Sequence, residues 1–184
     1  MSQVFKSFLS RVARESEFKP LKNKLLNYLK KESENKYKNY PRLLELMKNY
    51  WPKYQERSRI SHLLKDHYEE IFTFYLNSFF HFRKRGLSFL EPEAPTPVDF
   101  KLVFKYHYTS KEIEAVEEIM KEQKIEANTE SILKRIFIFA ISSFGFMVEQ
   151  IFGRPFAFQF FDISSNPLPN NECEIVAIIS GREQ

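Results

Sequence analysis

The segment FKLVFKYHY, residues 100–108, alternates with a period of two and is rich in aromatic and β-branched side chains. This pattern is typical of a β-strand with two chemically different faces. Helical patterns precede and follow it, and the 184-residue chain has 20 Phe but only 4 Gly. So few glycines favour helix over a Gly-rich sandwich. We therefore predict a mostly helical α+β fold.

The first half of the chain has helical periodicity interrupted by prolines. The clearest pattern runs from Ile60 to Phe79, and a basic stretch ending in Gly86 follows it, as helix ends prefer. The predicted helices lie at about 2–16, 20–34, 41–50 and 55–82.

A proline-rich stretch then separates two parts of the chain. Pro92, Pro95 and Pro97 lie within six residues, a composition that suits a semi-rigid extended linker. The predicted organisation is a basic helical region at 1–89, a linker at 90–99 and a C-terminal unit at 100–184.

The C-terminal unit is predicted to continue from its strand with two helices and two further strands. Thr109 or Ser110 caps the first helix, and Gly153 stops the second. The expected order is strand–helix–helix–strand–strand, with helices at about 110–123 and 129–152 and strands at 156–163 and 173–179.

The net charge of +4 hides an asymmetry. Residues 1–65 carry 16 Lys and Arg against 6 Asp and Glu, whereas residues 66–184 carry 12 against 18. A basic half favours a polyanionic partner such as nucleic acid or an anionic membrane surface. A solvated helical surface explains the same asymmetry without a partner.

We expect no transmembrane segment, because the longest apolar run, residues 136–148, is shorter than the roughly 20 residues that a bilayer requires. Residues 2–16 form a basic amphipathic pattern. It resembles a transit peptide or an interfacial anchor, although a first helix packed on the next one has the same pattern. No apolar secretory signal is visible, and we expect a cytoplasmic protein.

The motifs of common enzymes are missing from the sequence. The four glycines form no phosphate-binding loop, and no Gly-x-Ser-x-Gly motif occurs. His67 and Glu70 have the spacing to share a metal, but a lone pair of ligands is thin support. The single Cys173 lies among apolar strand residues, as inert core cysteines do. We predict no enzymatic activity, no cofactor and no metal.

Residues 100–141 resemble the ribbon-helix-helix family of DNA-binding proteins in the order, length and turn chemistry of one strand and two helices. The resemblance implies a dimer whose paired strands form a ribbon in the major groove. It also implies that the capped turn before the second helix holds a DNA phosphate.

This resemblance assigns candidate DNA-binding residues. Three strand residues would present donors or approach bases, the cap would bind phosphate, and two basic residues follow one turn later. These residues are Lys101, Lys105 and His107 on the strand, Asn128 and Thr129 at the cap, and Lys134 and Arg135 on the helix.

The predicted function is a non-enzymatic, homodimeric DNA-binding transcription regulator. Three alternatives stay open. Residues 100–108 could form a strand of a mixed sheet with one solvated basic face. The protein could be an assembly or interaction protein whose apolar helix and exposed strands pair with another subunit. Finally, residues 144–179 faintly resemble vinyl-reductase-like small-ligand sensor domains.

Overall fold

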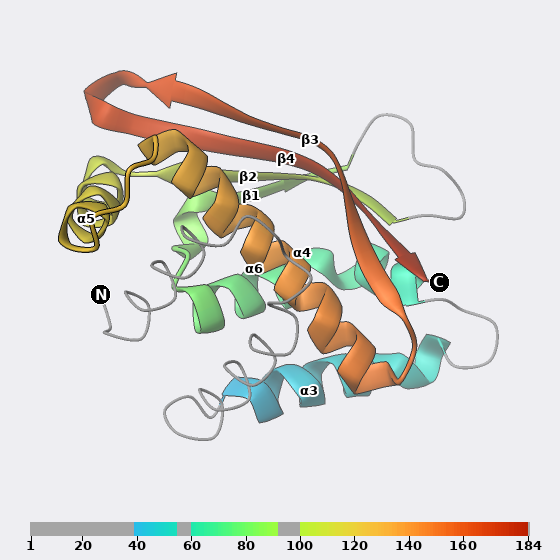
Figure 1. Cartoon of the computed structure of the whole chain (residues 1–184). Helices are drawn as coiled ribbons and strands as arrows, with labels where there is room; N and C mark the ends of the chain where they lie inside the picture. The colour runs from blue at the N-terminus through green and yellow to red at the C-terminus, as the bar shows by residue number, and fades with distance from the viewer. Residues whose placement is uncertain (1–38, 55–59, 92–99, 184) are drawn as a thin grey trace.

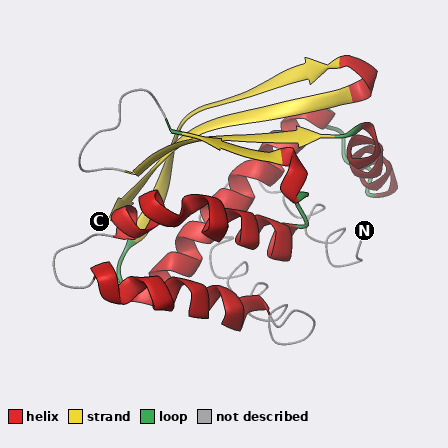
Figure 2. Ribbon diagram, turned by 180° about the vertical axis from the view of Figure 1, so that it is seen from behind, coloured by secondary structure: helices red, strands yellow, loops and turns green. Residues whose placement is uncertain are grey.

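A computed structural model describes residues 39–54, 60–91 and 100–183. Within these ranges the helices lie on one side of a four-stranded antiparallel sheet (Figures 1 and 2). The predicted mostly helical α+β class is confirmed. The expected helices at 2–16 and 20–34 fall outside the described residues. The elements are α3 Asn39–Tyr50, α4 Ile60–Phe80, β1 Leu87–Leu90, β2 Phe100–Tyr108, α5 Ser110–Glu122, α6 Thr129–Phe152, β3 Phe156–Leu168 and β4 Glu172–Glu183.

The strands are arranged in the order β1-β2-β4-β3, so β2 is an interior strand. Tyr106, for example, is paired with Leu87 of β1 on one side and with Ile175 of β4 on the other. Every interstrand pairing is antiparallel. The predicted strand at 100–108 is confirmed with its bounds, and both of its hydrogen-bonding edges have partners within the chain.

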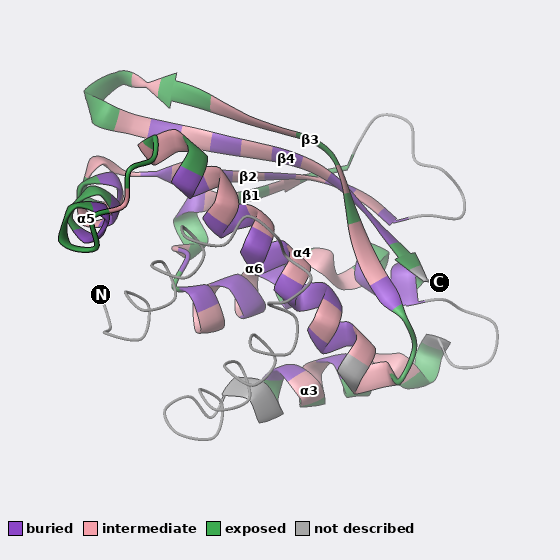
Figure 3. Cartoon of the chain, viewed as in Figure 1, coloured by how far each residue is buried: buried purple, intermediate pink, exposed green. Residues whose placement is uncertain are grey.

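One face of the sheet packs against the helices. The even-numbered residues of β2 are buried and the odd-numbered ones are only partly buried (Figure 3). Phe104 packs edge-on against Phe72 of α4 at 4.9 Å between ring centroids and against Phe137 of α6 at 6.0 Å. The period-two alternation in the sequence therefore marks a core-facing and an outward-facing row of side chains.

The described parts of the two predicted domains share one hydrophobic core. Phe89 of β1, from the N-terminal part, packs against Tyr68 of α4 and Phe104 of β2. Leu90, assigned to the linker from the sequence, is paired with Val103. The predicted boundary at 90–99 is therefore corrected, because the described residues on its two sides form one sheet and one core.

Helix α6 is the central apolar helix of the fold. Its N-cap is Asn128, whose side chain accepts a hydrogen bond from the Glu130 amide, and it ends at Gly153 with a left-handed φ of 64°. Its segment Thr129–Glu149 is long and apolar enough to span a membrane by length and composition, and 67% of that window is buried within the fold. Length and composition therefore do not exclude that this helix crosses a membrane. Most of its residues are nevertheless buried within the fold, as in the core helix of a folded domain.

Candidate functional site

The sheet face turned away from the helices, here called the outer face, has no described helix packed on it (Figures 1 and 2). The strand register places side chains from all four strands there. They include Ser88, Leu90, Lys101, Val103, Lys105, His107, Asp162, Ser164, Glu174, Val176 and Ile178.

Apolar side chains form a band across the outer face. Leu90 is paired with Val103, and Val103 is paired with Ile178, so three neighbouring strands contribute aliphatic groups side by side. Leu90 is 50% exposed, and Phe161, at the irregularity in β3, is 49% exposed. These two are the large exposed hydrophobic residues of the described chain. Leu90 belongs to the band, and Phe161 lies beside Lys101 on the same face.

The charges on the outer face are mixed in sign and arranged by strand. Lys101 and Lys105 lie on β2, whereas Glu174 lies on the adjacent β4 and Asp162 on β3. The Lys101 ammonium lies over the Phe161 ring, 5.3 Å from its centroid. The outer face thus carries charges of both signs around an apolar band.

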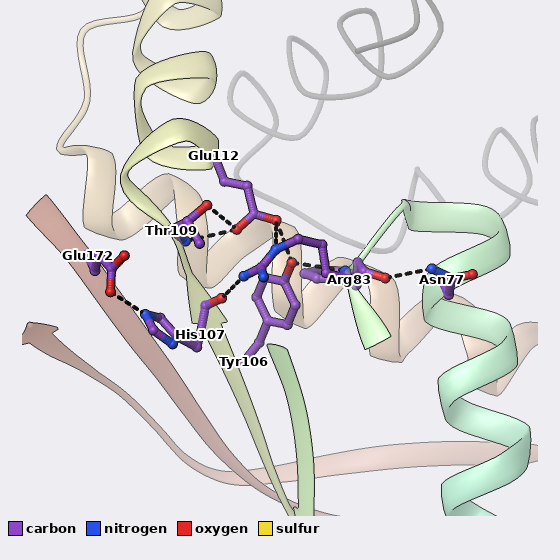
Figure 4. Close-up of polar contacts among 8 residues, drawn as sticks. Asn77, Arg83, Tyr106, His107, Thr109, Glu112 and Glu172 are labelled. Carbon is purple, nitrogen blue, oxygen red and sulfur yellow. Dashed lines mark hydrogen bonds and ion pairs between the residues drawn. The ribbon is translucent and has the colours of Figure 1, made fainter. Parts of the chain in front are cut away.

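A polar cluster lies at one end of the sheet, where α4, β2 and α5 meet (Figure 4). Glu112 Oε1 accepts hydrogen bonds from Arg83 Nε at 3.0 Å and from the Tyr106 hydroxyl at 2.6 Å. Its Oε2 accepts from the Thr109 amide at 2.8 Å and from the Thr109 hydroxyl at 3.0 Å. Arg83 also donates to the His107 carbonyl at 2.8 Å. The carboxylate is therefore satisfied at both oxygens and ties three elements together.

The local sequence explains this convergence. Helix α4 ends at Phe80, earlier than the predicted residue 82, and His81 has a left-handed φ of 58°. The Asn77 side chain donates to the Phe82 carbonyl at 3.0 Å, which holds the turn that brings Arg83 toward α5. On the other side, Thr109 and Glu112 form a capping box at the start of α5.

Burial and hydrogen bonding set the protonation of this cluster. Burial acts to raise the pKa of Glu112, but the hydrogen bonds from Arg83, Tyr106 and Thr109 together hold it below its usual value. The pKa of Tyr106 is raised, first by burial and then by its hydrogen bond to Glu112. Glu112 is thus an ionised anchor, and its partners are the protonated Tyr106 and Arg83.

The ribbon expected from the resemblance does not form. Two chains could pair their strands at 100–108 only through a free edge, and β2 has β1 on one edge and β4 on the other. The ribbon geometry is therefore wrong, because the alternation that suggested it belongs to an interior strand. DNA binding itself stays a prediction.

The predicted DNA-binding residues lie on opposite sides of the sheet. Lys101, Lys105 and His107 belong to the outer face, and His107 Nε2 is 2.7 Å from Glu172 Oε2. The other four residues are on the helix side, at the start of α6, where Glu130 receives a hydrogen bond from Ser165 of β3. They are Asn128 and Thr129 at the cap, Lys134, which forms an ion pair with Glu130 at 3.1 Å, and Arg135.

The two metal-ligand candidates from the sequence, His67 and Glu70, both contact Tyr50. His67 stacks on the Tyr50 ring at 3.8 Å between centroids, and the Tyr50 hydroxyl donates to Glu70. Cys173 is buried and does not form a disulfide. Among the described residues no group of three or more His, Cys, Asp or Glu is arranged to hold a metal ion.

Sequence reasoning did not identify Arg83, Tyr106 or the outer-face band as functional features. The Thr109-x-x-Glu112 spacing is the capping-box signature and could have identified Glu112. The sequence could not show that Leu90 and Ile178 belong to one surface, because both are placed beside Val103 by the pairing of three separate strands. Comparisons with family models, curated proteins and solved structures give no match to this chain.

Proposed function

We propose that the protein is a non-catalytic assembly subunit whose outer face docks a second copy of the same chain. The observation that carries this proposal is the apolar band Leu90–Val103–Ile178, with Phe161 and Val176 beside it, on a face without a described helix. Removing such an apolar surface from water favours association of the two chains. A homodimer is also the commonest assembly of soluble chains.

The size of the outer face suits a dimer interface. Nine residues of β2, rising about 3.3 Å each, and four strands about 4.8 Å apart give a flat area of roughly 600 Å². Stable interfaces bury about 800 Å² on each partner. Interdigitating side chains add accessible area to the flat value, so the two areas are comparable.

The charge pattern is complementary at one end of the outer face. A two-fold axis parallel to the sheets and running between β2 and β4 places β2 of each copy opposite β4 of the other. With this axis parallel to the strands, Lys101 of one copy lies over Ser180 of the other, Lys105 lies over Val176, and His107 lies over Glu174. Two stacked sheets also pack with their strands roughly aligned. Opposite charges of the two copies therefore come near each other at one end of the face, where Glu174 lies two residues along the strand from the position opposite Lys105.

The proposal is tested by placing a charge in the band. We expect the wild type to sediment with twice the 22.1 kDa chain mass and Ile178→Lys to sediment as a folded monomer. The matched control is Leu44→Lys on α3, a partly buried aliphatic residue in the helix layer, and it should stay dimeric. A monomeric wild type at about 100 μM, or an Ile178→Lys dimer as tight as the wild type, overturns the proposal.

The same proteins separate this function from DNA binding. An assembly subunit shows only feeble duplex binding without sequence preference. A regulator would bind specific DNA with an affinity that falls steeply as salt rises, because phosphate contacts release counterions. Saturable, salt-dependent binding that Lys101→Ala and Lys105→Ala weaken would favour the regulator.

A further inference from the structure

One end of the outer face carries a histidine beside two carboxylates. His107 Nε2 on β2 is 2.7 Å from Glu172 Oε2 on β4 (Figure 4), and Glu174, two residues further along β4, is the cross-strand partner of His107. The His107 side chain is 43% exposed and that of Glu172 is 29% exposed. The imidazole is therefore in contact with solvent and can exchange its proton with it.

Lys105 is the cation that shares the outward row of β2 with His107, from which it is two residues away. The neighbouring strand β3 contributes the uncharged Asn166, which is paired with Glu174. On strands β2, β3 and β4 of one chain, this end of the outer face therefore carries two carboxylates, one ammonium group and one imidazole.

The other cations near His107 lie on the opposite side of β2, where β1 is paired. Arg83 donates to the His107 main-chain carbonyl at 2.8 Å and belongs to the polar cluster around Glu112. The short helix η2, Lys84–Gly86, packs beside the same carbonyl, and its Lys84 and Arg85 are exposed to solvent. These three cations precede β1, so they lie away from β4 and from the two-fold axis of the proposed dimer.

The proposed dimer brings two of these ends together. With the axis along the strands, between β2 and β4, His107 of one copy lies over Glu174 of the other. Each imidazole then has Glu172 of its own chain beside it and a carboxylate of the second copy opposite it. With both imidazoles neutral, the glutamates near the axis outnumber the Lys105 ammonium groups, and like charges facing each other oppose association. With both imidazoles protonated, the two signs balance.

We propose that His107 makes the outer-face dimer sensitive to pH, so that two copies associate more tightly as the pH falls from 8 to 5.5. This inference rests on the dimer proposed above. Histidine is the side chain that ordinarily changes its charge in this range, whereas glutamate and lysine keep theirs. The sign follows because the dimer places Glu174 of the second copy opposite the imidazolium, a contact that a monomer lacks. The dimer therefore takes up protons that two monomers do not bind.

Sedimentation equilibrium of the full chain at pH 8 and at pH 5.5, at one ionic strength, measures this effect. We expect the Kd of the dimer to be about tenfold lower at pH 5.5, because two symmetric exposed ion pairs contribute about threefold each. His107→Gln, which is neutral at both pH values, should bring the two Kd values within about twofold of each other. The matched control is His62→Gln, an exposed histidine on α4 in the helix layer, which should keep the tenfold ratio.

A second variant tests the residue opposite the histidine. Glu174→Gln removes the carboxylate that the second copy presents but keeps the pair between His107 and Glu172 within each chain. It should dimerise at least about twofold more tightly than the wild type at pH 8, because fewer carboxylates face each other. It should also lose most of the pH dependence. A purely structural effect of the substitution would instead change the Kd by the same factor at both pH values.

The outcomes separate this inference from the dimer itself. A wild type that is monomeric at about 100 μM at both pH values overturns both proposals. A dimer that Ile178→Lys disrupts, but whose Kd is the same at pH 8 and at pH 5.5, overturns the pH dependence alone. A dimer that is weaker at pH 5.5, or a tenfold ratio that His107→Gln retains, also overturns the role of His107.

Discussion

The Tyr106 hydroxyl donates a 2.6 Å hydrogen bond to Glu112 while it accepts a 3.1 Å hydrogen bond from the Arg83 amide. One hydroxyl on β2 therefore joins the segment after α4 to the first turn of α5. Two residues later on the same strand, the Tyr108 hydroxyl has no hydrogen-bond partner in the described chain. Both tyrosines are buried, but only the Tyr106 hydroxyl has hydrogen-bond partners. Removing each hydroxyl in turn therefore compares a satisfied with an unsatisfied buried hydroxyl.

Removing each hydroxyl separately should have opposite effects on stability. Tyr106→Phe leaves the Arg83 amide and one Glu112 hydrogen bond unmade, so we expect the free energy of unfolding to fall by about 1–2 kcal/mol. Tyr108→Phe deletes a buried hydroxyl without a partner and should leave stability unchanged or raise it by up to about 1 kcal/mol. Urea unfolding of both variants tests this, and an equal loss in both would contradict the hydrogen-bond assignment.

Removing the Glu112 carboxylate should destabilise the protein more than removing the Tyr106 hydroxyl does. Glu112→Ala removes the capping box and the partner of Arg83, so the free energy of unfolding should fall by about 2–3 kcal/mol. Glu114→Ala, on the exposed side of the same helix, is the control and should change stability by less than about 0.5 kcal/mol. Similar losses for both would mean that helix propensity alone is measured.

The contribution of Glu112 should depend on pH in a defined direction. Its pKa in the folded protein is below the usual value of 4.5, so the ionised form stabilises the fold at higher pH. The stability difference between the wild type and Glu112→Gln should be constant above about pH 5 and shrink as the pH falls below 4.5. Unfolding measured across this range tests the sign, and a difference that grows on acidification contradicts it.

Gly86 should be intolerant of a side chain because of its position against Tyr106. A Cβ there would lie 2.9 Å from Tyr106 Cε2 and 3.1 Å from the His107 carbonyl oxygen. Gly86→Ala should therefore lower the free energy of unfolding by about 1–3 kcal/mol. Gly153 is left-handed with nothing within 4 Å of its Cβ position, and Gly153→Asn should be nearly neutral in the same assay.

The sequence predicted those elements whose signals are local. Alternation defined β2, and the Asn128 cap and Gly153 defined the ends of α6. The strand predicted at 156–163 continues to Leu168, through the polar residues that follow the irregularity after Phe160. β1 was missed because four residues between Gly86 and the prolines are too short to show a period.

The site could not be predicted because its parts are distant in the chain. A strand with alternating faces fits an edge ribbon and an interior strand equally well, and only the pairing of β2 with both β1 and β4 decides between them. His107 likewise lies beside Glu172 and Glu174 only because β2 pairs with β4. The residues of these sites are therefore brought together by strand pairing and core packing between segments that are separate in the sequence.

The most direct test of the outer-face dimer is an isotope-filtered NMR measurement on a mixture of labelled and unlabelled full-length chains. Docking through the apolar band predicts intermolecular NOEs to the methyl groups of Val103, Val176 and Ile178. It predicts none to Ile136 and Val116, which face the core on the other side of the sheet. A spectrum without intermolecular NOEs, or one in which they arise only from helix-layer methyl groups, would contradict the account.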